Sequence, residues 1–213
     1  MNRSIRRSLI TVGLILLPGF ATTPAEASAS GCEPIAAARQ KALGSSVSVI
    51  GTVTVPSGAF DIGFAIQQAG HGIYVLDAAG ASRRAGDVVR VTGTLVDSSG
   101  LLSIQPTSVA LLSDGSTVRA HPSATGRVGE ATEGRLLQLR GTMLGPLVDD
   151  SPFGFEIDID DGSGPIQIFL YPGTGISTEG LIPGAKIDTS CFSNQFEATY
   201  ECDPPSPASF QVE

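Results

Sequence analysis

The chain has 213 residues, a formal net charge of −8, 41% hydrophobic residues and only 16% charged residues. An excess of acidic side chains disfavours tight binding of the whole surface to a polyanion, because lysines and arginines supply most of that attraction. Any binding of nucleic acid is therefore expected to depend on a local basic patch.

Residues 1–29 have the pattern of a cleavable export signal. A basic start is followed by an apolar run over Leu9–Leu17 and a small-residue exit. The run is far shorter than the roughly 20 residues that cross a bilayer. The predicted mature chain begins at Ser30, has a net charge of about −10 and no membrane span, and lies in the periplasm or outside the cell. Arg6-Arg7 leaves the twin-arginine route open, and a lipid anchor on Cys32 is a further alternative.

The lead-in over residues 30–45 predicts one short helix. Pro34–Leu43 is rich in helix formers and is followed by Gly44, which favours a helix end. Its apolar residues fall on one side, so we expect the helix to cover one end of the domain that follows.

From Val47 onward, alternating apolar and polar residues predict β-strands. The expected strands are Val47–Val55 with a bend at Gly51, Phe60–Ile66, Ile73–Asp77, Val88–Val96 and Leu101–Gln105. Five short strands with a bent first strand predict a small closed barrel.

A diverged second copy of this unit follows a polar link. Val49–Val53 matches Leu139–Met143, and Gly63–Gln67 matches Gly154–Asp158. The repeat predicts two domains. Near the C-terminus, regular structure is expected to end at Pro204, Pro205 and Pro207. The expected parts are a signal (1–29), a lead-in (30–45), domain 1 (46–113), a linker (114–132) and domain 2 (133–213).

Four stretches of the first copy carry a family likeness: Val49–Thr54, Gly72–Val75, Gly86–Gly93 and Ser98–Ile104. Together they resemble bacterial exported OB-fold modules of the kind found beside secreted nucleases. The resemblance covers nearly all of the mature chain. It implies an all-β fold of two tandem OB-like five-stranded barrels with a short N-terminal helix, and binding of an oligonucleotide or oligosaccharide across the second and third strands. The chain departs from strong base-stacking proteins, since it has no Trp and three Tyr.

The cysteine spacing predicts one disulfide. If the turn at Ser98-Ser99 makes Gly93 face Ile104, the same spacing places Cys191 opposite Cys202 in the second copy. Opposed strand residues can bring their β-carbons within disulfide range. We therefore expect a Cys191–Cys202 bond, with Cys32 unpaired.

The tightest basic group is the candidate ligand site. Arg83, Arg84 and Arg90 are expected to lie next to Tyr74 on the third strand of the first barrel. Arginines and an aromatic ring are the minimum for holding a phosphate and a base. The alternative is a solvated loop without a ligand.

Two other groups of polar residues are weighed against simpler roles. Glu156, Asp158 and Asp160, followed by Asp161, supply oxygen ligands for calcium, but lack the spacing of a calcium loop, so a solvated strand face is favoured. The only histidines, His71 and His121, match no metal or triad motif and are expected in exposed loops.

These patterns predict an exported, non-catalytic binding module without a cofactor. The expected partners are single-stranded nucleic acid or an oligosaccharide, bound weakly. The alternative is a protein-interaction or structural accessory module of the bacterial envelope that contacts another exported protein. An enzyme would need a converging set of titratable groups, which the sequence does not indicate.

Overall fold

The structure is a computed structural model that describes residues 31–76 and 82–213. The predicted export signal and its twin-arginine motif lie outside the described residues, as does the predicted end of the third strand at Asp77. Within the described ranges, no helix has the length and apolar character that crossing a membrane requires.

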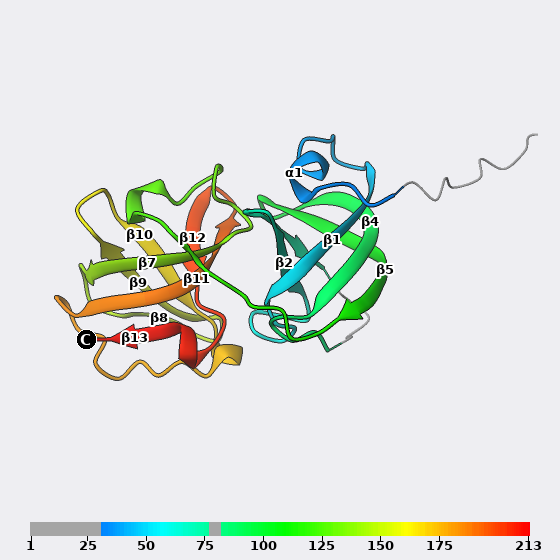
Figure 1. Ribbon diagram of the computed structural model, residues 1–213. Helices are drawn as coiled ribbons and strands as arrows, with labels where there is room; N and C mark the ends of the chain where they lie inside the picture. The colour runs from blue at the N-terminus through cyan, green and yellow to red at the C-terminus, as the bar shows by residue number, and fades with distance from the viewer. Residues whose placement is uncertain (1–30, 77–81) are drawn as a thin grey trace, which may run out of the picture. The chain divides into compact units, whose positions relative to one another are not determined.

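The first barrel closes with strand order β1-β2-β3-β5-β4 (Figure 1). Its strands are β1 (Ser46–Val55), β2 (Phe64–Gln68), β3 (His71–Val75), β4 (Val88–Ser98) and β5 (Leu101–Ser113). Neighbouring strands are antiparallel except β3 and β5, which are parallel. This order is that of an OB-like barrel, as predicted.

The first strand bends where it changes neighbour. Ser46–Thr52 pairs with β4, whereas Thr52–Val55 pairs with β2. Gly51 lies just before the change, and a Cβ there would lie 3.0 Å from Ile66 Cβ and 3.3 Å from the Gln67 carbonyl oxygen. The absence of a side chain lets β2 cross closely over β1.

The N-terminal helix is shorter than predicted. α1 spans Ile35–Ala38, and these two residues are fully buried in the core of the first barrel. Beyond them, the Gly44 N–H donates to the Leu95 carbonyl, and Leu43 is 58% exposed. A helix continued to Leu43 would bury no further apolar residue, which explains its early end.

The second barrel repeats the strand order of the first. Its strands are β7 (Leu136–Met143), β9 (Gly154–Asp160), β10 (Ile166–Leu170), β11 (Lys186–Phe196) and β12 (Thr199–Asp203). They pair in the order β7-β9-β10-β12-β11, and β11 pairs again with β7. The parallel pair is β10 and β12. The predicted fold class, two OB-like five-stranded barrels with a short helix, is confirmed; where one domain ends and the next begins stays a prediction.

Several short elements were not predicted. They are β6 (His121–Pro122), β8 (Val148–Asp150), β13 (Phe210–Val212) and the 3₁₀ helices η1 (Thr125–Arg127), η2 (Pro172–Thr174) and η3 (Pro207–Ser209). β13 pairs with β11, so the prediction that the C-terminal prolines end regular structure is wrong. The prolines lie before this strand and in η3, where no ladder N–H is needed from them.

The predicted register of β4 and β5 is wrong by two residues. The turn centres on Ser99 and Gly100, which have φ values of 54° and 98°. A two-residue hairpin turn of this kind needs positive φ at both central residues. Leu95 therefore faces Ile104, and Gly93 faces Pro106.

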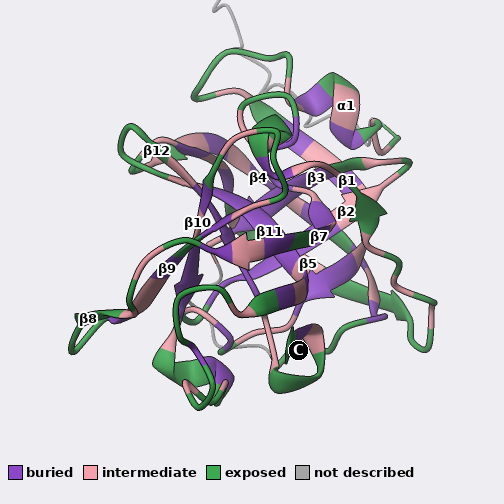
Figure 2. Ribbon diagram, turned by 90° about the vertical axis from the view of Figure 1, so that its left-hand side faces the viewer, coloured by how far each residue is buried: buried purple, intermediate pink, exposed green. Residues whose placement is uncertain are grey.

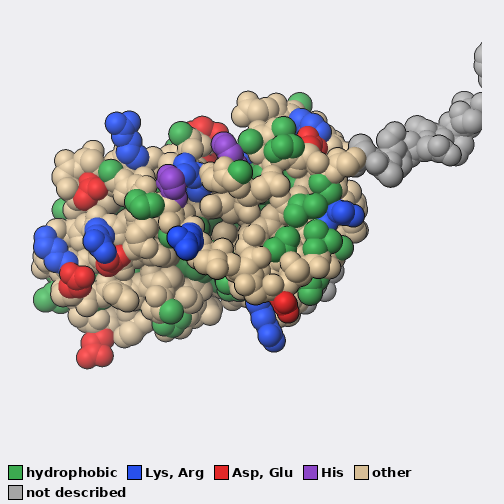
Figure 3. Space-filling model, in the orientation of Figure 1, with side chains coloured by type: hydrophobic (Ala, Val, Ile, Leu, Met, Phe, Trp, Pro, Cys, Tyr) green, Lys and Arg blue, Asp and Glu red, His purple; other side chains and the backbone are tan. Residues whose placement is uncertain are grey.

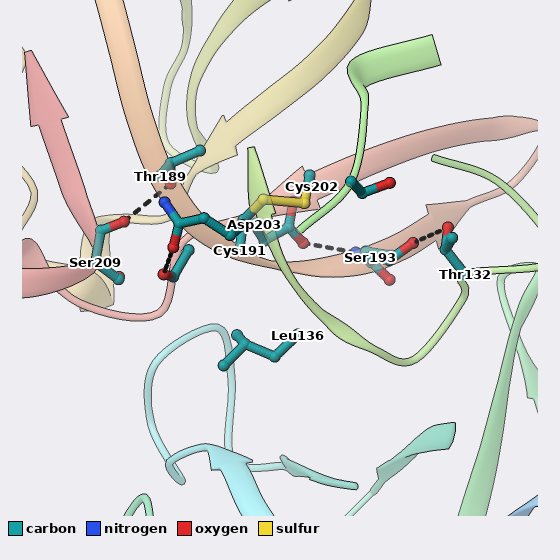
Figure 4. The surroundings of a disulfide bond; sticks show 12 residues. Thr132, Leu136, Thr189, Cys191, Ser193, Cys202, Asp203 and Ser209 are labelled. Carbon is teal, nitrogen blue, oxygen red and sulfur yellow. Dashed lines mark hydrogen bonds between the residues drawn. A yellow bond between two sulfur atoms is a disulfide. The ribbon is translucent and has the colours of Figure 1, made fainter. Parts of the chain in front are cut away.

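The Cys191–Cys202 disulfide is confirmed, with 5.3 Å between the Cα atoms (Figure 4). Cys202 faces Ser193 rather than Cys191, so the cysteines lie diagonally across β11 and β12. In the first barrel the same diagonal joins Gly93 and Ile104, where a Cβ on the glycine would lie 2.7 Å from Ile104 Cγ2. The two barrels thus fill equivalent positions with a disulfide and with an isoleucine side chain.

The two barrels touch through backbone and side chains. A Cβ on Gly72 would lie 1.7 Å from the Gly134 carbonyl oxygen, so the two glycines meet backbone to backbone. Beside them, Arg39 forms a 2.8 Å salt bridge with Glu133, and both side chains are largely buried. Burial raises the pKa of Glu133, against the opposing effect of Arg39.

Candidate ligand-binding groove

The outer face of β10 and β12 carries aromatic and acidic side chains. Because strand residues alternate, Ile168 and Cys202 point into the core of the second barrel. Phe169 and Glu201 point to the opposite face. Figure 2 shows β8, β9, β10 and β12 following one another along one side of the protein, and their register confirms that they are neighbours.

A groove of about 580 Å³ lies on this face. It is lined by Asp150, Phe153, Glu156, Gln167, Phe169, Tyr171, Phe196, Thr199 and Glu201. These residues come from β9, β10 and β12, from the loop between β7 and β9 that includes β8, and from the hairpin of β11 and β12. The strand pairing places Glu156 beside Phe169 and Gln167 beside Glu201.

Aromatic rings form the wall and floor of the groove. Phe169 packs edge-on to Tyr171 with 4.6 Å between ring centroids. Gly154 makes room for the Phe169 ring, since a Cβ there would lie 2.6 Å from Phe169 Cε1. Phe153 and Phe196 stand at the rim and are 67% and 57% exposed.

One amide beside the groove holds two carboxylates, of which Glu201 lines the groove. Asn194 Nδ2 donates to Glu201 Oε1 and to Asp203 Oδ2, both at 2.8 Å. Asp203 is fully buried, and its Oδ1 has no hydrogen-bond partner among the described residues. Burial, together with the negative charge of Glu156, raises the pKa of Glu201 to about 7, although the Asn194 bond works in the opposite direction. Burial and Glu201 raise the pKa of Asp203 as well.

The same face of the first barrel is closed. Tyr74 lies on β3 as Phe169 lies on β10. Each packs over a glycine, which is Gly63 just before β2 or Gly154 at the start of β9. Tyr74 is only 4% exposed because Phe192 of the second barrel covers it, with ring centroids 5.7 Å apart. The Tyr74 hydroxyl donates a hydrogen bond to Asp61. Burial, and to a smaller extent this hydrogen bond, raises the pKa of Tyr74.

A row of rings continues from the groove into the space between the barrels. Phe60 contacts Tyr171 at 4.9 Å and Phe192 at 6.1 Å between ring centroids. A smaller cavity of about 170 Å³ lies here, with Asp61 and Asn194 in its lining. Among the described residues that line this cavity and the groove, none is Lys or Arg.

The structure brings the predicted arginines to one side of the first barrel, but not to Tyr74. Arg83 Nη2 donates to the Val109 carbonyl at 3.2 Å, and Arg90 faces the adjacent Ala110. The Arg84 N–H donates to Asp87 in the turn between them. Tyr74 pairs with Ser103, seven residues from Ala110 along β5, which is about 23 Å of strand. A role for the arginines in ligand contact stays a prediction.

Asp160 and Asp161, two of the candidate calcium ligands, accept hydrogen bonds from neighbouring protein groups instead. Asp160 Oδ1 accepts the Gly162 and Gly164 N–H groups. Hydrogen bonds from Ser163 and Thr125 lower the pKa of Asp161 to about 2. Across residues 31–76 and 82–213, no three His, Cys, Asp or Glu side chains are grouped to hold a metal ion. His71 and His121 are exposed, as predicted, but they lie on β3 and β6 rather than in loops.

Sequence reasoning missed the groove. Phe169 is apolar within an apolar strand and therefore indicates a core position, although strand alternation places it with Gln167 rather than with Ile168. The repeat was the available signal, because Gly63 and Tyr74 of the first copy correspond to Gly154 and Phe169 of the second.

No protein-family model and no curated protein sequence matches the chain. Among solved structures, the HIN2 domain of tetrameric p202 is 14% identical over 80% of this chain and 93% of that chain, with a TM-score of 0.35. A murine DNA-binding protein bound to double-stranded DNA is 11% identical over 78% of this chain and 94% of that chain, with a TM-score of 0.40. A replication protein A heterotrimer bound to single-stranded DNA is 9% identical over 79% of this chain and 49% of that chain, with a TM-score of 0.33. At these TM-scores the likeness supports no inference about a ligand.

Proposed function

We propose that the protein is an exported, non-catalytic binding module whose ligand lies in the groove on β9, β10 and β12. The observation that carries this proposal is the asymmetry between the barrels. Phe192 of the second barrel covers Tyr74, whereas the equivalent Phe169, itself only 8% exposed, lines a groove of about 580 Å³ together with the exposed rings of Phe153 and Phe196. That size is typical of ligand pockets.

The position of the groove supports a binding role. In OB-folds, ligands commonly contact the second and third strands together with the loops between strands one and two and between strands four and five. The groove residues Phe153, Phe169 and Phe196 come from these parts of the second barrel. Fold alone does not determine function, so the proposal rests on the rings and carboxylates gathered there.

Export is the finer part of the proposal and rests on two features. The predicted signal ends at residue 29, and the intrachain disulfide is typical of proteins from oxidising compartments. Export is tested by measuring the intact mass of the protein purified from its native host. A mature chain beginning near Ser30 supports export, and an intact chain with Met1 contradicts it.

The non-catalytic part is tested by assaying nuclease activity in the presence of divalent metal. Glu201 and Asp203 are engaged by Asn194, and Asp160 and Asp161 by backbone and hydroxyl groups, which supports a binding role. Metal-dependent cleavage that is lost on replacing Glu156, Asp158 and Asp160 together would overturn it.

Weak binding of single-stranded nucleic acid is the second candidate function. It is favoured by Arg83 and Arg90, which approach neighbouring residues of β5 from one side. On the face shown in Figure 3, Lys and Arg side chains are scattered rather than continuous. Few phosphate contacts are therefore expected, and affinity should be low.

The absence of tryptophan provides a direct test. Phe153→Trp places a unique fluorophore at the groove rim, and Leu111→Trp places one on β5 near the arginines, at a side chain that is also exposed. Each variant is titrated with a lysine oligomer, a neutral glucan oligosaccharide and oligo(dT). We expect a saturable change with Phe153→Trp for one of these ligands and none with Leu111→Trp. A response from Leu111→Trp alone, to oligo(dT), would favour the second candidate.

A further inference from the structure

The chemistry of the groove indicates which ligand it takes, given that the groove is the binding site. Three carboxylates from three strands line it: Asp150 of β8, Glu156 of β9 and Glu201 of β12. The ion pairs formed by the described residues are Arg39–Glu133, Lys41–Glu33 and Arg140–Asp188, and none of them involves these carboxylates. The groove therefore has negative charge without a cation of its own.

Beside the groove, Asn194 holds two carboxylate side chains in fixed positions. Asn194 fixes both Glu201 and Asp203, and Glu201 is only 5% exposed. Asn194 Nδ2 satisfies one oxygen on each carboxylate, and Asp203 Oδ1 is buried without a partner in the described structure. Two nearby carboxylates resist simultaneous ionisation, and a bound cation would relieve this repulsion.

The aromatic rings of the groove provide apolar and cation-binding surface beside the carboxylates. Phe169 is the strand partner of Glu156, so a ring and a carboxylate stand side by side on the floor. Aromatic faces attract Lys and Arg head groups, and their aliphatic stems pack on apolar surface. The exposed rings of Phe153 and Phe196 add apolar surface to the groove lining, which favours a peptide with several aliphatic side-chain stems over a small amine.

We propose that the groove binds an extended basic peptide, with one Lys or Arg side chain lying over Phe169 and its charged head between Glu156 and Glu201. This recognition differs from the polyanion or oligosaccharide binding that the sequence suggests. It needs no movement of the barrels, because the groove is open on the surface.

The binding should depend on pH through Glu201. The groups that face it are Glu156 on β9, Asp203 on its own strand, Tyr171 at the end of β10 and the neutral Asn194. No described Lys or Arg lines the groove. Affinity for a cation should therefore rise between pH 6 and pH 8 as Glu201 loses its proton.

The probe is tetralysine capped at both ends, with the same peptide acetylated on every Nζ as its neutral match. Calorimetry is done near 0.15 M salt, where distant surface charges are largely screened. We expect binding by the wild-type protein, no detectable binding of the acetylated peptide, and at least tenfold weaker binding by the Glu156→Gln/Glu201→Gln variant. Glu179→Gln, the same change at an exposed loop carboxylate outside the groove, should stay within twofold.

Equal binding of the acetylated peptide, or an equal loss in Glu179→Gln, would overturn the proposal, since recognition would then be non-ionic or a whole-surface effect. Spermidine binding as well as tetralysine would also contradict it by showing that no peptide is needed. If the double variant does not fold, the half-buried Glu156→Gln alone serves the same purpose. A Phe153→Trp response to glucan or oligo(dT) but not to tetralysine would reject the basic peptide and keep the groove.

Discussion

Tyr74 and Phe169 occupy the same position in the two barrels, each packed over a glycine at or just before the start of the preceding strand. Their surroundings differ, because Phe192 covers Tyr74 whereas Phe169 lines an open groove. The contact between the barrels thus removes one of two equivalent faces from solvent. The groove on the second barrel is therefore the face at which we propose that the ligand binds.

The raised pKa of Glu201 predicts a pH-dependent stability. A carboxyl group whose pKa is about 7 when folded and 4.5 ordinarily holds its proton more tightly in the folded state. The contribution of Glu201 to the free energy of unfolding is then greatest below about pH 4.5, falls as pH rises to about 7, and is constant above that. At pH 8, Glu201→Gln should raise the free energy of unfolding by on the order of 1–3 kcal/mol, measured by urea denaturation.

The control for this prediction is Glu179→Gln, which should leave the pH profile unchanged. Some pH dependence should persist in Glu201→Gln, because Asp203 remains buried with a raised pKa. A Glu201→Gln variant that is less stable than wild type at pH 8 would contradict the assigned direction. Gln keeps the oxygen that accepts from Asn194, so this hydrogen bond should survive.

The disulfide should stabilise the second barrel. It closes a short loop, with a sequence separation of 11 residues, so replacing Cys191 and Cys202 together by Ser should lower the free energy of unfolding by about 2–3 kcal/mol. A reducing agent should destabilise the wild-type protein and leave the double variant unaffected. The unfolded, unreduced protein should titrate with one thiol, that of Cys32. Three thiols would show that the bond does not form.

The glycine contact between the barrels should tolerate no side chain. Gly72→Ala would place its Cβ 1.7 Å from the Gly134 carbonyl oxygen, which belongs to rigid backbone. We expect a loss of at least about 2 kcal/mol in the free energy of unfolding. The matched change Gly145→Ala meets nothing within 4 Å and should shift stability by less than about 0.5 kcal/mol. Equal effects of the two changes would exclude a tight contact.

Any nucleic-acid binding should be weak and should depend on the arginines of the first barrel. Arg83→Ala/Arg84→Ala should remove most binding of oligo(dT) and leave the circular dichroism spectrum unchanged. With at most three phosphate contacts, the log–log salt slope should be about −2, at roughly 0.7 per contact. Tight binding with a steep slope, or an unaffected double variant, would place the nucleic-acid site elsewhere.

Much of the fold could be predicted because strand alternation and turn residues are local signals. The bend at Gly51 and the five-stranded barrels follow from such patterns. The cysteine pair was predicted correctly, but from a register that placed Cys191 directly opposite Cys202, whereas the two lie diagonally across β11 and β12. The predicted register of β4 and β5 is wrong because the turn centres on Ser99-Gly100, one residue after the predicted Ser98-Ser99. The positive φ of Ser99, which this turn requires, is not visible in the sequence. β13 was missed because a three-residue strand is too short to show alternation, and the prolines before it indicate the end of regular structure.

The site could be predicted only in part, since it depends on how the barrels meet. The sequence predicts Tyr74 next to the arginines, yet Phe192 buries it and β5 separates it from Arg90. Phe169 belongs to an apolar run, so composition alone suggests a core residue. The pairing of Glu201 and Asp203 through Asn194 needs three residues on two strands and is invisible without their register.

Residue-resolved NMR during a titration with capped tetralysine tests the central claim most directly. Binding in the groove predicts saturable shifts of backbone amide signals on β9, β10 and β12, centred on Glu156, Phe169 and Glu201, with those around Arg90 unchanged. Shifts centred on β4 and β5, or small shifts spread evenly over all acidic residues, would contradict the groove as the binding site.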